Sequence, residues 1–405
     1  MSLDFRKFLS KRTELLKESE IRELLKLTEG RDIISLAGGL PDPSTFPRDK
    51  LASIAQRVIE DLGDKALQYS PTPGVTPFRR VLTTFLERNR VKVRGDDDLI
   101  VTAGSQEALY LLAKAVIDPG DYVLVEAPTY LAAINVFREY GAKFISAPVD
   151  DEGMNVHVLE ERAKKAVREG ARLKLIYTIP TCQNPSGVTL SRDRRKHLME
   201  LAEDLDLLIV EDDPYSFFSF EPIDAEHLKT MDLNGRVIYI GTLSKILSPG
   251  LRIGWALGPS WLIRTMELAK QTVDLHSSTL SQYVAMEAIR EGVVDETIER
   301  AKRLYKMKRD VMLEALEEYF PEGSRWTKPA GGLFVFAYAP EGIDTKKLLP
   351  EAIDRGVAYV PGASFFVEGG GQNTMRLNFS YPPPELIREG IKRLGSLLRE
   401  KIGSR

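Results

Sequence analysis

Cysteine is nearly absent from this chain, which has 405 residues and a single cysteine, Cys182. One cysteine excludes an intrachain disulfide, and it also excludes a zinc or iron–sulfur site built from clustered cysteines. Such sparing use of cysteine is typical of proteins in a reducing compartment, so we expect a cytoplasmic location. The sequence assigns no role to Cys182 itself.

Histidine is scarce as well, with four residues in the whole chain. No two of them have the H-x-x-x-H spacing that would place two metal ligands on one face of a helix. We therefore expect no metal site. The four residues are His157, His197, His227 and His276.

An excess of positive charge and long apolar runs are missing too. Lysine and arginine number 56, and aspartate and glutamate 59, which gives a net charge of −3. Proteins that bind duplex nucleic acid usually carry a basic excess, so we expect no nucleic-acid partner. No stretch approaches the ~18 apolar residues of a membrane span, and Met1–Arg22 is rich in charge, so we expect neither a signal peptide nor a membrane partner.

From about residue 99, short apolar and β-branched runs alternate with segments of helical periodicity. This alternation is typical of βα units around a parallel sheet, so the sequence predicts a large α/β domain. The predicted strands are Leu99–Ala103, Tyr122–Glu126, Lys143–Val149, Leu173–Ile179, Leu207–Glu211, Val237–Thr242 and Ile253–Leu257. The predicted helices between them include Ser105–Ile117 and Arg192–Asp204.

A long amphipathic segment, Asp295–Tyr319, predicts a helix that leaves this sheet. Strand-like runs and the closing helix Glu385–Lys401 predict a smaller α+β domain, and a charged helix near Leu15–Leu27 is expected to pack on it. The predicted strands of that domain are Leu333–Tyr338, Val357–Val360 and Met375–Ser380. We therefore divide the chain into an N-terminal segment (1–50), a large domain (51–295) and a small domain (296–405).

One lysine stands directly after a predicted strand. The segment from Thr242 to Gly254 reads T-L-S-K-I-L-S-P-G-L-R-I-G, in which Lys245 is followed by a Pro-Gly turn and by Arg252. Ligand crevices of α/β sheets form at the carboxyl ends of the strands. Although most lysines are simply solvated, Lys245 is therefore a candidate for chemistry.

This segment resembles the S-K-x-x-x-P-G-x-R element of pyridoxal phosphate (PLP) enzymes of the aspartate-aminotransferase type (class I/II). Further motifs follow in family order from about Arg22 to Arg376 and beyond, which is nearly the whole chain. The resemblance implies PLP fold type I, with a mostly parallel seven-stranded sheet flanked by helices and a smaller α+β domain. It also implies that Lys245 forms the Schiff base with PLP and later moves the Cα proton of the substrate.

Three more motifs resemble elements of the family that bind the PLP ring. In the segment E-D-D-P-Y, Asp212 would pair with the pyridine nitrogen and Tyr215 would donate to the phenolic oxygen. By residue type alone, Asp212 and Asp213 could instead cap a helix or bind a metal. Asn184 in Q-N-P-S-G would contact the same phenolic oxygen, and Tyr130 in A-P-T-Y would stack on the ring.

The phosphate of PLP would lie where a strand meets a helix N-terminus, because unpaired N–H groups point outward there. Serine and glycine at such a position are also ordinary capping residues. Tyr69 resembles the family residue that reaches the phosphate of the partner subunit, which implies a homodimer with shared active sites. The other implied phosphate ligands are Gly104, Ser105, Gln106, Thr242, Ser244 and Arg252.

Arg376, in M-R-L-N-F-S, matches the family arginine that binds the α-carboxylate of the substrate, since a guanidinium can donate two parallel hydrogen bonds. Gly39 and Asn184 would lie beside the same carboxylate. The S-x-I-R pattern ending at Arg22 resembles the α-aminoadipate and kynurenine aminotransferase group, in which this arginine can meet an acidic or polar substrate tail. Arg22 could equally be a solvated helix residue paired with a glutamate.

Together these motifs predict an aminotransferase that moves an amino group between an L-amino acid and a 2-oxo acid by a ping-pong cycle. Glutamate and 2-oxoglutarate are the expected common pair, and aromatic, 2-aminoadipate and alanine/glyoxylate pairs stay open. The alternatives are a PLP-dependent lyase on the same scaffold, and a regulator that only senses PLP. The regulator is disfavoured because the segment before Leu36 is too short for a helix-turn-helix domain. A nicotinamide dehydrogenase is disfavoured because no G-x-G-x-x-G opens a helix after a strand.

Overall fold

A mixed eight-stranded sheet forms the larger part of the computed structural model, which describes residues 5–16 and 32–403. The strand order is β2-β9-β8-β7-β6-β3-β4-β5. The neighbours β8, β7, β6, β3 and β4 run parallel, whereas β9 is antiparallel to both of its neighbours. The strands are β2 (Asp97–Thr102), β3 (Tyr122–Ala127), β4 (Lys143–Asp150), β5 (Gly153–Met154), β6 (Leu173–Thr178), β7 (Leu208–Asp212), β8 (Val237–Thr242) and β9 (Gly254–Pro259).

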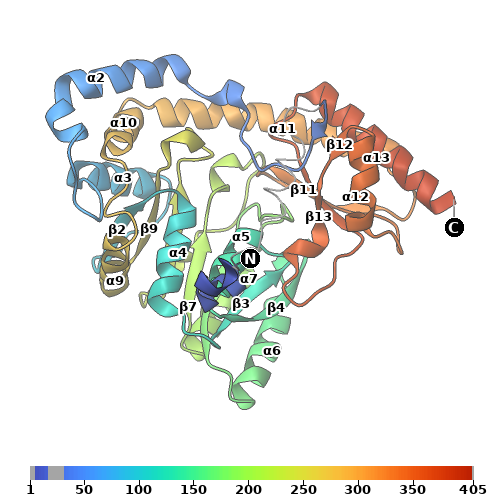
Figure 1. Ribbon diagram of the computed structural model, residues 1–405, viewed down its shortest axis with the longest axis horizontal. Coiled ribbons are helices and arrows are strands. Elements are labelled where there is room, and N and C mark those ends of the chain that lie inside the picture. Colours follow the sequence, from blue (N-terminus) through green and yellow to red (C-terminus); the bar gives the residue numbers. More distant parts are fainter. Residues whose placement is uncertain (1–4, 17–31, 404–405) are drawn as a thin grey trace.

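Helices cover this sheet on both faces (Figure 1). On β3, Val123 and Val125 belong to the larger hydrophobic core, while Leu124 between them belongs to a second core. Because successive side chains of a strand point to opposite faces, both faces of the sheet are buried. Helices α4, α5, α9 and α10 pack in the larger core, and α6 and α7 pack in the second one. The helices up to this point are α2 (Arg48–Ala66), α3 (Thr76–Arg88), α4 (Ser105–Val116), α5 (Leu131–Glu139), α6 (Val156–Arg168), α7 (Arg192–Asp204), α8 (Leu228–Met231), α9 (Ser260–Gln271) and α10 (Thr279–Arg290).

A long helix, α11 (Val293–Tyr319), leads to a second, antiparallel sheet of order β10-β11-β14-β13. In Figure 1 this sheet lies on the right, with α12 and α13 beside it, and α13 packs against α11. Near the N-terminus, β1 (Ile34–Ser35) pairs in parallel with β12 (Val357–Ala358), which ties the segment before α2 to this part of the molecule. The remaining elements are β10 (Arg325–Trp326), β11 (Phe334–Tyr338), α12 (Thr345–Asp354), β13 (Val360–Pro361), β14 (Thr374–Asn378) and α13 (Pro384–Gly403).

The predicted α/β class is confirmed, with two differences in detail. The large sheet has an eighth strand, β5, whose two residues are too few to produce a periodic pattern. The predicted strand Val357–Val360 is two strands, because the chain passes from β12, which pairs with β1, to β13, which pairs with β14.

The N-terminal prediction is covered only in part. Of the helix predicted near Leu15–Leu27, only Leu15 and Leu16 are among the described residues, and Leu15 ends a 3-10 helix, Lys11–Leu15; the rest of the predicted helix lies outside the described residues. The division at residues 50 and 295 stays a prediction. No helix in the described ranges is both long and apolar enough to span a membrane.

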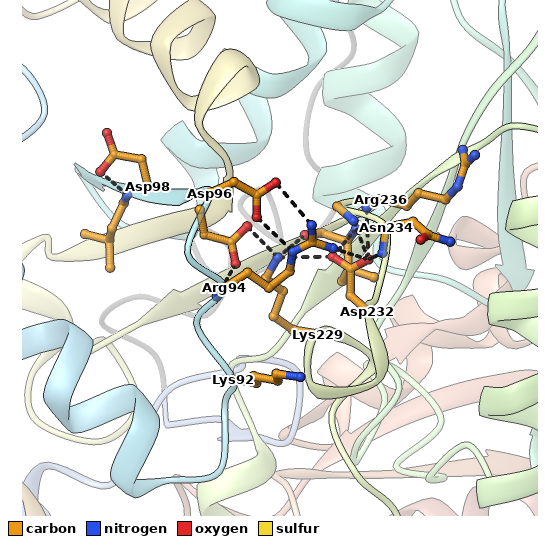
Figure 2. Close-up of polar contacts among 12 residues, drawn as sticks. Lys92, Arg94, Asp96, Asp98, Lys229, Asp232, Asn234 and Arg236 are labelled. Atoms are coloured by element: carbon orange, nitrogen blue, oxygen red, sulfur yellow. Dashed lines mark hydrogen bonds and ion pairs between the residues drawn. The ribbon is translucent and has the colours of Figure 1, made fainter.

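Charged side chains gather at the amino ends of β2 and β8 (Figure 2). The ammonium of Lys229, on α8, is fully buried and donates to Asp97 Oδ1 at 2.9 Å, Asp232 Oδ2 at 3.2 Å and the carbonyl oxygen of Val237 at 3.0 Å. Asp232 also accepts hydrogen bonds from backbone N–H groups of the turn that leads into β8. Lys229 thus has an acceptor for each of its three hydrogens, and the cluster joins the starts of two strands.

Candidate active site

Lys245 follows β8 at the carboxyl edge of the sheet, at the opposite end of that strand from Lys229. Its Nζ donates to the carbonyl oxygen of Gly39 at 2.7 Å. Burial lowers the pKa of Lys245 to about 8, and the positive charges of Arg376 and Arg252 contribute to the lowering. About a tenth of the amine is therefore neutral at pH 7, several hundredfold more than for an ordinary lysine, and the neutral form is the one that a nucleophile or a general base requires.

The buried lysines of the described chain have a different environment. Lys229, Lys270 and Lys308 are buried and each is paired with a carboxylate, whereas Lys245, which is partly buried, makes no ion pair with any described residue. The pairs are Lys229 with Asp97 and Asp232, Lys270 with Glu107 and Asp274, and Lys308 with Asp42. Lys245 alone among these four is therefore left without a compensating charge.

Asp212 ends β7, the strand beside β8. Its Oδ2 accepts a hydrogen bond from the Tyr177 hydroxyl at 2.8 Å, while its buried Oδ1 has no partner among the described residues. Burial raises the pKa of Asp212 to about 7, and the charge of Asp213 adds to this. A buried acceptor without a donor costs ~1–3 kcal/mol, so this oxygen is suited to a donor that the chain itself does not supply.

Asp213, the adjacent carboxylate, already accepts hydrogen bonds at both of its oxygens. Its Oδ2 accepts from the Tyr239 hydroxyl at 2.8 Å and from the Ser216 hydroxyl at 2.6 Å, and its Oδ1 accepts from the Ser216 N–H at 3.0 Å. Asp213 therefore supports the loop after β7, and Asp212 is the one of the pair that has an unused oxygen.

Arg376, on β14, is buried, and its guanidinium lies near two aromatic rings. The guanidinium carbon lies 4.3 Å from the ring centre of Phe334 and 5.3 Å from that of Phe365. Its Nη1 donates to Asn184 Oδ1 at 2.9 Å and its Nη2 to the carbonyl oxygen of Ala37 at 2.7 Å, whereas its Nε has no partner among the described residues. Burial lowers the pKa of Arg376 to about 10, so an anionic ligand would be well matched to this position.

Asn184 connects this arginine to Tyr215. The Nδ2 of Asn184 lies 3.4 Å from the Tyr215 hydroxyl, and the Tyr215 ring packs edge-on against Phe334. Burial raises the pKa of Tyr215 above its ordinary value, so the hydroxyl stays protonated and can donate. The chain thus forms a continuous polar path from Arg376 through Asn184 to Tyr215.

Arg252 lies against the start of α4. Gly104, directly before this helix, has φ of +80°, and a Cβ at this position would come within 2.7 Å of Arg252 Nη2. Only glycine allows the guanidinium to approach this closely. The hydroxyls of Thr242 and Ser244 lie 2.8 Å apart at the end of β8. The first two residues of α4, with N–H groups that have no partner inside the helix, are Ser105 and Gln106.

The remaining predicted residues lie in several places. Tyr130 is partly buried and immediately precedes α5, whereas Tyr69 is 78% exposed and packs edge-on against His276 at 5.6 Å. The carbonyl of Gly39 accepts from Lys245, as described above. Arg22 lies outside the described residues.

Sequence reasoning missed a buried set of residues behind Asn184. Glu126, at the end of β3, accepts from the Thr178 hydroxyl at 2.6 Å and from Gln183 Nε2 at 2.9 Å, and Gln183 Oε1 accepts from the Ser186 N–H at 2.8 Å. Burial raises the pKa of Glu126 to about 7. The set fixes the turn that carries Asn184, and its signal in the sequence is a lone glutamate in the apolar strand Tyr122–Ala127.

Tyr177 and Cys182 were also not assigned from the sequence. Tyr177, on β6, is the donor that holds Asp212 Oδ2, and only the pairing of β6 with β7 brings the two together. The thiol of Cys182 is buried, lies 3.9 Å from the Thr189 hydroxyl and would meet a Cβ on Gly331 at 2.7 Å. Burial raises the pKa of Cys182 to about 12, so this cysteine is an unreactive packing residue.

A family model described as "Aminotransferase class I and II" matches residues 31–394. The chain belongs to this family. An aromatic-amino-acid aminotransferase of Thermococcus litoralis is 50% identical to it over 402 residues, covering 99% of this chain and 96% of that protein.

Solved structures of aminotransferases share the fold over essentially their full length. A multiple substrate aminotransferase from Thermococcus profundus has a TM-score of 0.96 and 50% identity, covering 100% of both chains. A kynurenine aminotransferase from Pyrococcus horikoshii, solved with PMP, has a TM-score of 0.95 and 49% identity, covering 98% of both. The α-aminoadipate aminotransferase LysN from Thermus thermophilus, solved with N-(5′-phosphopyridoxyl)-L-leucine, has a TM-score of 0.91 and 37% identity, covering 100% of both.

These findings confirm the predicted enzyme class and cofactor: the protein is an aminotransferase, and its cofactor is pyridoxal 5′-phosphate. The described residues fit this cofactor on structural grounds. The unpaired Oδ1 of Asp212 suits the protonated ring nitrogen, and the start of α4 with Arg252 suits the phosphate.

Proposed function

We propose that this aminotransferase moves an amino group between an L-amino acid and a 2-oxo acid by a ping-pong cycle in which Lys245 is the catalytic residue. The observation that carries the proposal is the environment of Lys245: a buried amine, without a carboxylate partner in the described chain, whose pKa falls to about 8. The neutral amine would take the proton from the substrate Cα and later return a proton.

The other site residues would bind and orient. When bound, PLP supplies an electron sink for the charge that develops when the Cα proton leaves. Asp212 would stay ionised against the positive ring nitrogen, since the partner charge offsets the desolvation that otherwise raises its pKa. Tyr215 and Asn184 would bind the phenolic oxygen, and Tyr130 would lie on the ring.

The remaining residues would hold the two anionic groups. Arg252 would bind the phosphate together with the start of α4. Arg376 would bind the substrate carboxylate beside Gly39, with its unpaired Nε as an available donor. The ligands proposed at the start of α4 and the end of β8 are Gly104, Ser105, Gln106, Thr242 and Ser244.

For the substrates, we propose glutamate and 2-oxoglutarate as the common pair, with an aromatic or 2-aminoadipate-like amino acid as the other partner. The similarity to aromatic-amino-acid, kynurenine and α-aminoadipate aminotransferases supports this choice. Arg22 is the proposed contact for the substrate tail, with a solvated role as the alternative.

We also propose a homodimer with shared active sites and a cytoplasmic location. Tyr69 supports the dimer, because it is 78% exposed and Leu67, nearby in the chain, is 66% exposed, so this segment offers apolar surface to a partner subunit. The single, buried cysteine is consistent with a reducing compartment.

Single-turnover half-reactions would test the proposed cycle. The PLP form of the enzyme is mixed with one amino acid at a time, without a 2-oxo acid, and the product is identified. We expect one equivalent of 2-oxo acid per site and then no further product until 2-oxoglutarate is added. Continuous product release without an acceptor would indicate the lyase alternative, and the absence of any product from a broad panel of amino acids would indicate a PLP-sensing protein.

A further inference from the structure

Two helices on the second core bring together three side chains of metal-ligating type, two from α6 and one from α7, about 40 residues further along the chain. His157 and Glu160 lie on α6 and His197 lies on α7, and one ligand atom from each lies within 4.8 Å of the others. We propose that His157, Glu160 and His197 form a binding site for a divalent transition-metal ion such as Zn²⁺. This proposal departs from the expectation of no metal site, which rested on histidine spacing along the chain, because the packing of α6 on α7 brings the two histidines together. The site is separate from the proposed active site and shares no residue with it.

The distances between the ligand groups of this cluster are close to those in a metal coordination sphere. His197 Nε2 lies 2.8 Å from Glu160 Oε2, and the ring centres of His157 and His197 are 4.4 Å apart. Zinc binds nitrogen and oxygen ligands at ~2.0–2.2 Å, so tetrahedral ligands lie a little over 3 Å from one another. Small side-chain rotations would therefore accommodate the ion.

The backbone under the cluster is firmly held. Leu159, beside Glu160, and Leu198, beside His197, are completely buried in the same hydrophobic core. The N-terminus of α6 is capped by Asn155, whose side chain accepts from the Val158 N–H at 3.2 Å. The ligands thus project from a rigid pair of helices, which reduces the entropy lost on binding a metal.

The ligand types also select the ion. Two imidazoles and one carboxylate suit zinc and neighbouring transition metals, whereas magnesium and calcium prefer oxygen ligands alone. His157 is exposed and lines an open groove with His197 and Glu200, so solvent can reach the cluster and complete the coordination. Zinc sites with three protein ligands are known, and in them water or another small ligand fills the fourth position.

Lys164 competes with the ion. It lies one turn beyond Glu160 on α6 and donates to Glu160 Oε1 at 2.5 Å. Its ammonium opposes a second cation at the same carboxylate, which sets a simple expectation: removal of the Lys164 charge should strengthen metal binding, whereas removal of a ligand should weaken it.

Calorimetric titration of the PLP-loaded enzyme with zinc chloride tests the proposal. We expect one zinc ion per chain, at least ~10-fold weaker binding in His157→Ala, Glu160→Gln and His197→Ala, and tighter binding in Lys164→Gln. Glu161→Gln is the matched control, because Glu161 is an exposed neighbour on α6 that is not in the cluster, and it should bind zinc as the unmodified enzyme does. Zinc should also raise the melting temperature of the enzyme and of Glu161→Gln, but not that of the ligand variants.

Two results would overturn the proposal. One is no measurable binding to the unmodified enzyme. The other is binding that the three ligand substitutions leave unchanged, which would show an adventitious ion only. Turnover of each variant without added metal checks that it is folded, since the cluster has no part in the proposed reaction.

Discussion

The two ends of β8 place two lysines in opposite environments. At the amino end, Lys229 has three acceptors, two of them on carboxylates (Figure 2). Just beyond the carboxyl end, Lys245 has one carbonyl oxygen and faces two arginine charges, while Asp212 nearby keeps an oxygen without a donor. Paired charges stabilise the starts of the strands, and unpaired charges at their ends are available for a ligand.

Replacing Lys245 should have the largest effect on catalysis. Lys245→Ala should lower turnover by about 10⁴-fold, at the upper end of the range for a lost general base, because the proton transfer at Cα loses its base. Its melting temperature without cofactor should not fall, since the buried amine has no ion pair to lose. Steady-state kinetics and calorimetry on the same preparation check both statements, and a fully active Lys245→Ala would refute the proposed role.

Replacing Lys229 should have the opposite effect: a large loss of stability and no loss of turnover. Lys229→Met leaves Asp97 and Asp232 buried without their counter-charge, so we expect a loss of ~3–5 kcal/mol in the free energy of unfolding. The turnover of the folded fraction should stay unchanged. Lys92→Met, at an exposed lysine on the same edge, is the control and should unfold as the unmodified protein does. Equal stability of the two variants would contradict a structural role for the cluster.

The sequence predicts which charged residues follow the strands much better than it predicts which partners those residues contact. The strands stand out because parallel strands buried on both faces are apolar runs, and the candidate ligands stand out because they follow such runs. Which carboxylate oxygen lacks a donor depends on Tyr177 from the neighbouring strand. The aromatic rings around Arg376 and the approach of His157 to His197 likewise depend on packing between distant segments.

Replacing Asp212 should separate stability from activity. Burial raises the pKa of Asp212 from 3.8 to about 7. As the pH rises through this range, the carboxylate ionises in the unfolded chain while it stays protonated in the folded one, so the cofactor-free fold loses stability. Asp212→Asn stays neutral, so without cofactor it should be more stable at pH 8 by up to about 4 kcal/mol, an advantage that vanishes below about pH 4. The loaded variant should be ~10²- to 10³-fold less active. Denaturant unfolding at several pH values would show an advantage independent of pH if this explanation is wrong.

The smallest predicted effect is a shift on the pH axis. The rate at which cofactor-free enzyme binds PLP covalently should rise with pH and level off above a midpoint of about 8, because only the neutral amine of Lys245 reacts. An ordinary lysine would place the midpoint near 10.5. Stopped-flow absorbance measures this rate, and a midpoint near the ordinary value would contradict the influence of burial on Lys245.

The most direct test of the central claim is to reduce the PLP-loaded enzyme with borohydride, digest it and map the peptide that carries the pyridoxyl group. The structure predicts a single modified residue, Lys245, with Lys229, Lys270 and Lys308 unmodified because their ammonium groups are held in ion pairs. A pyridoxyl group on any other lysine, or on none, would contradict the claim.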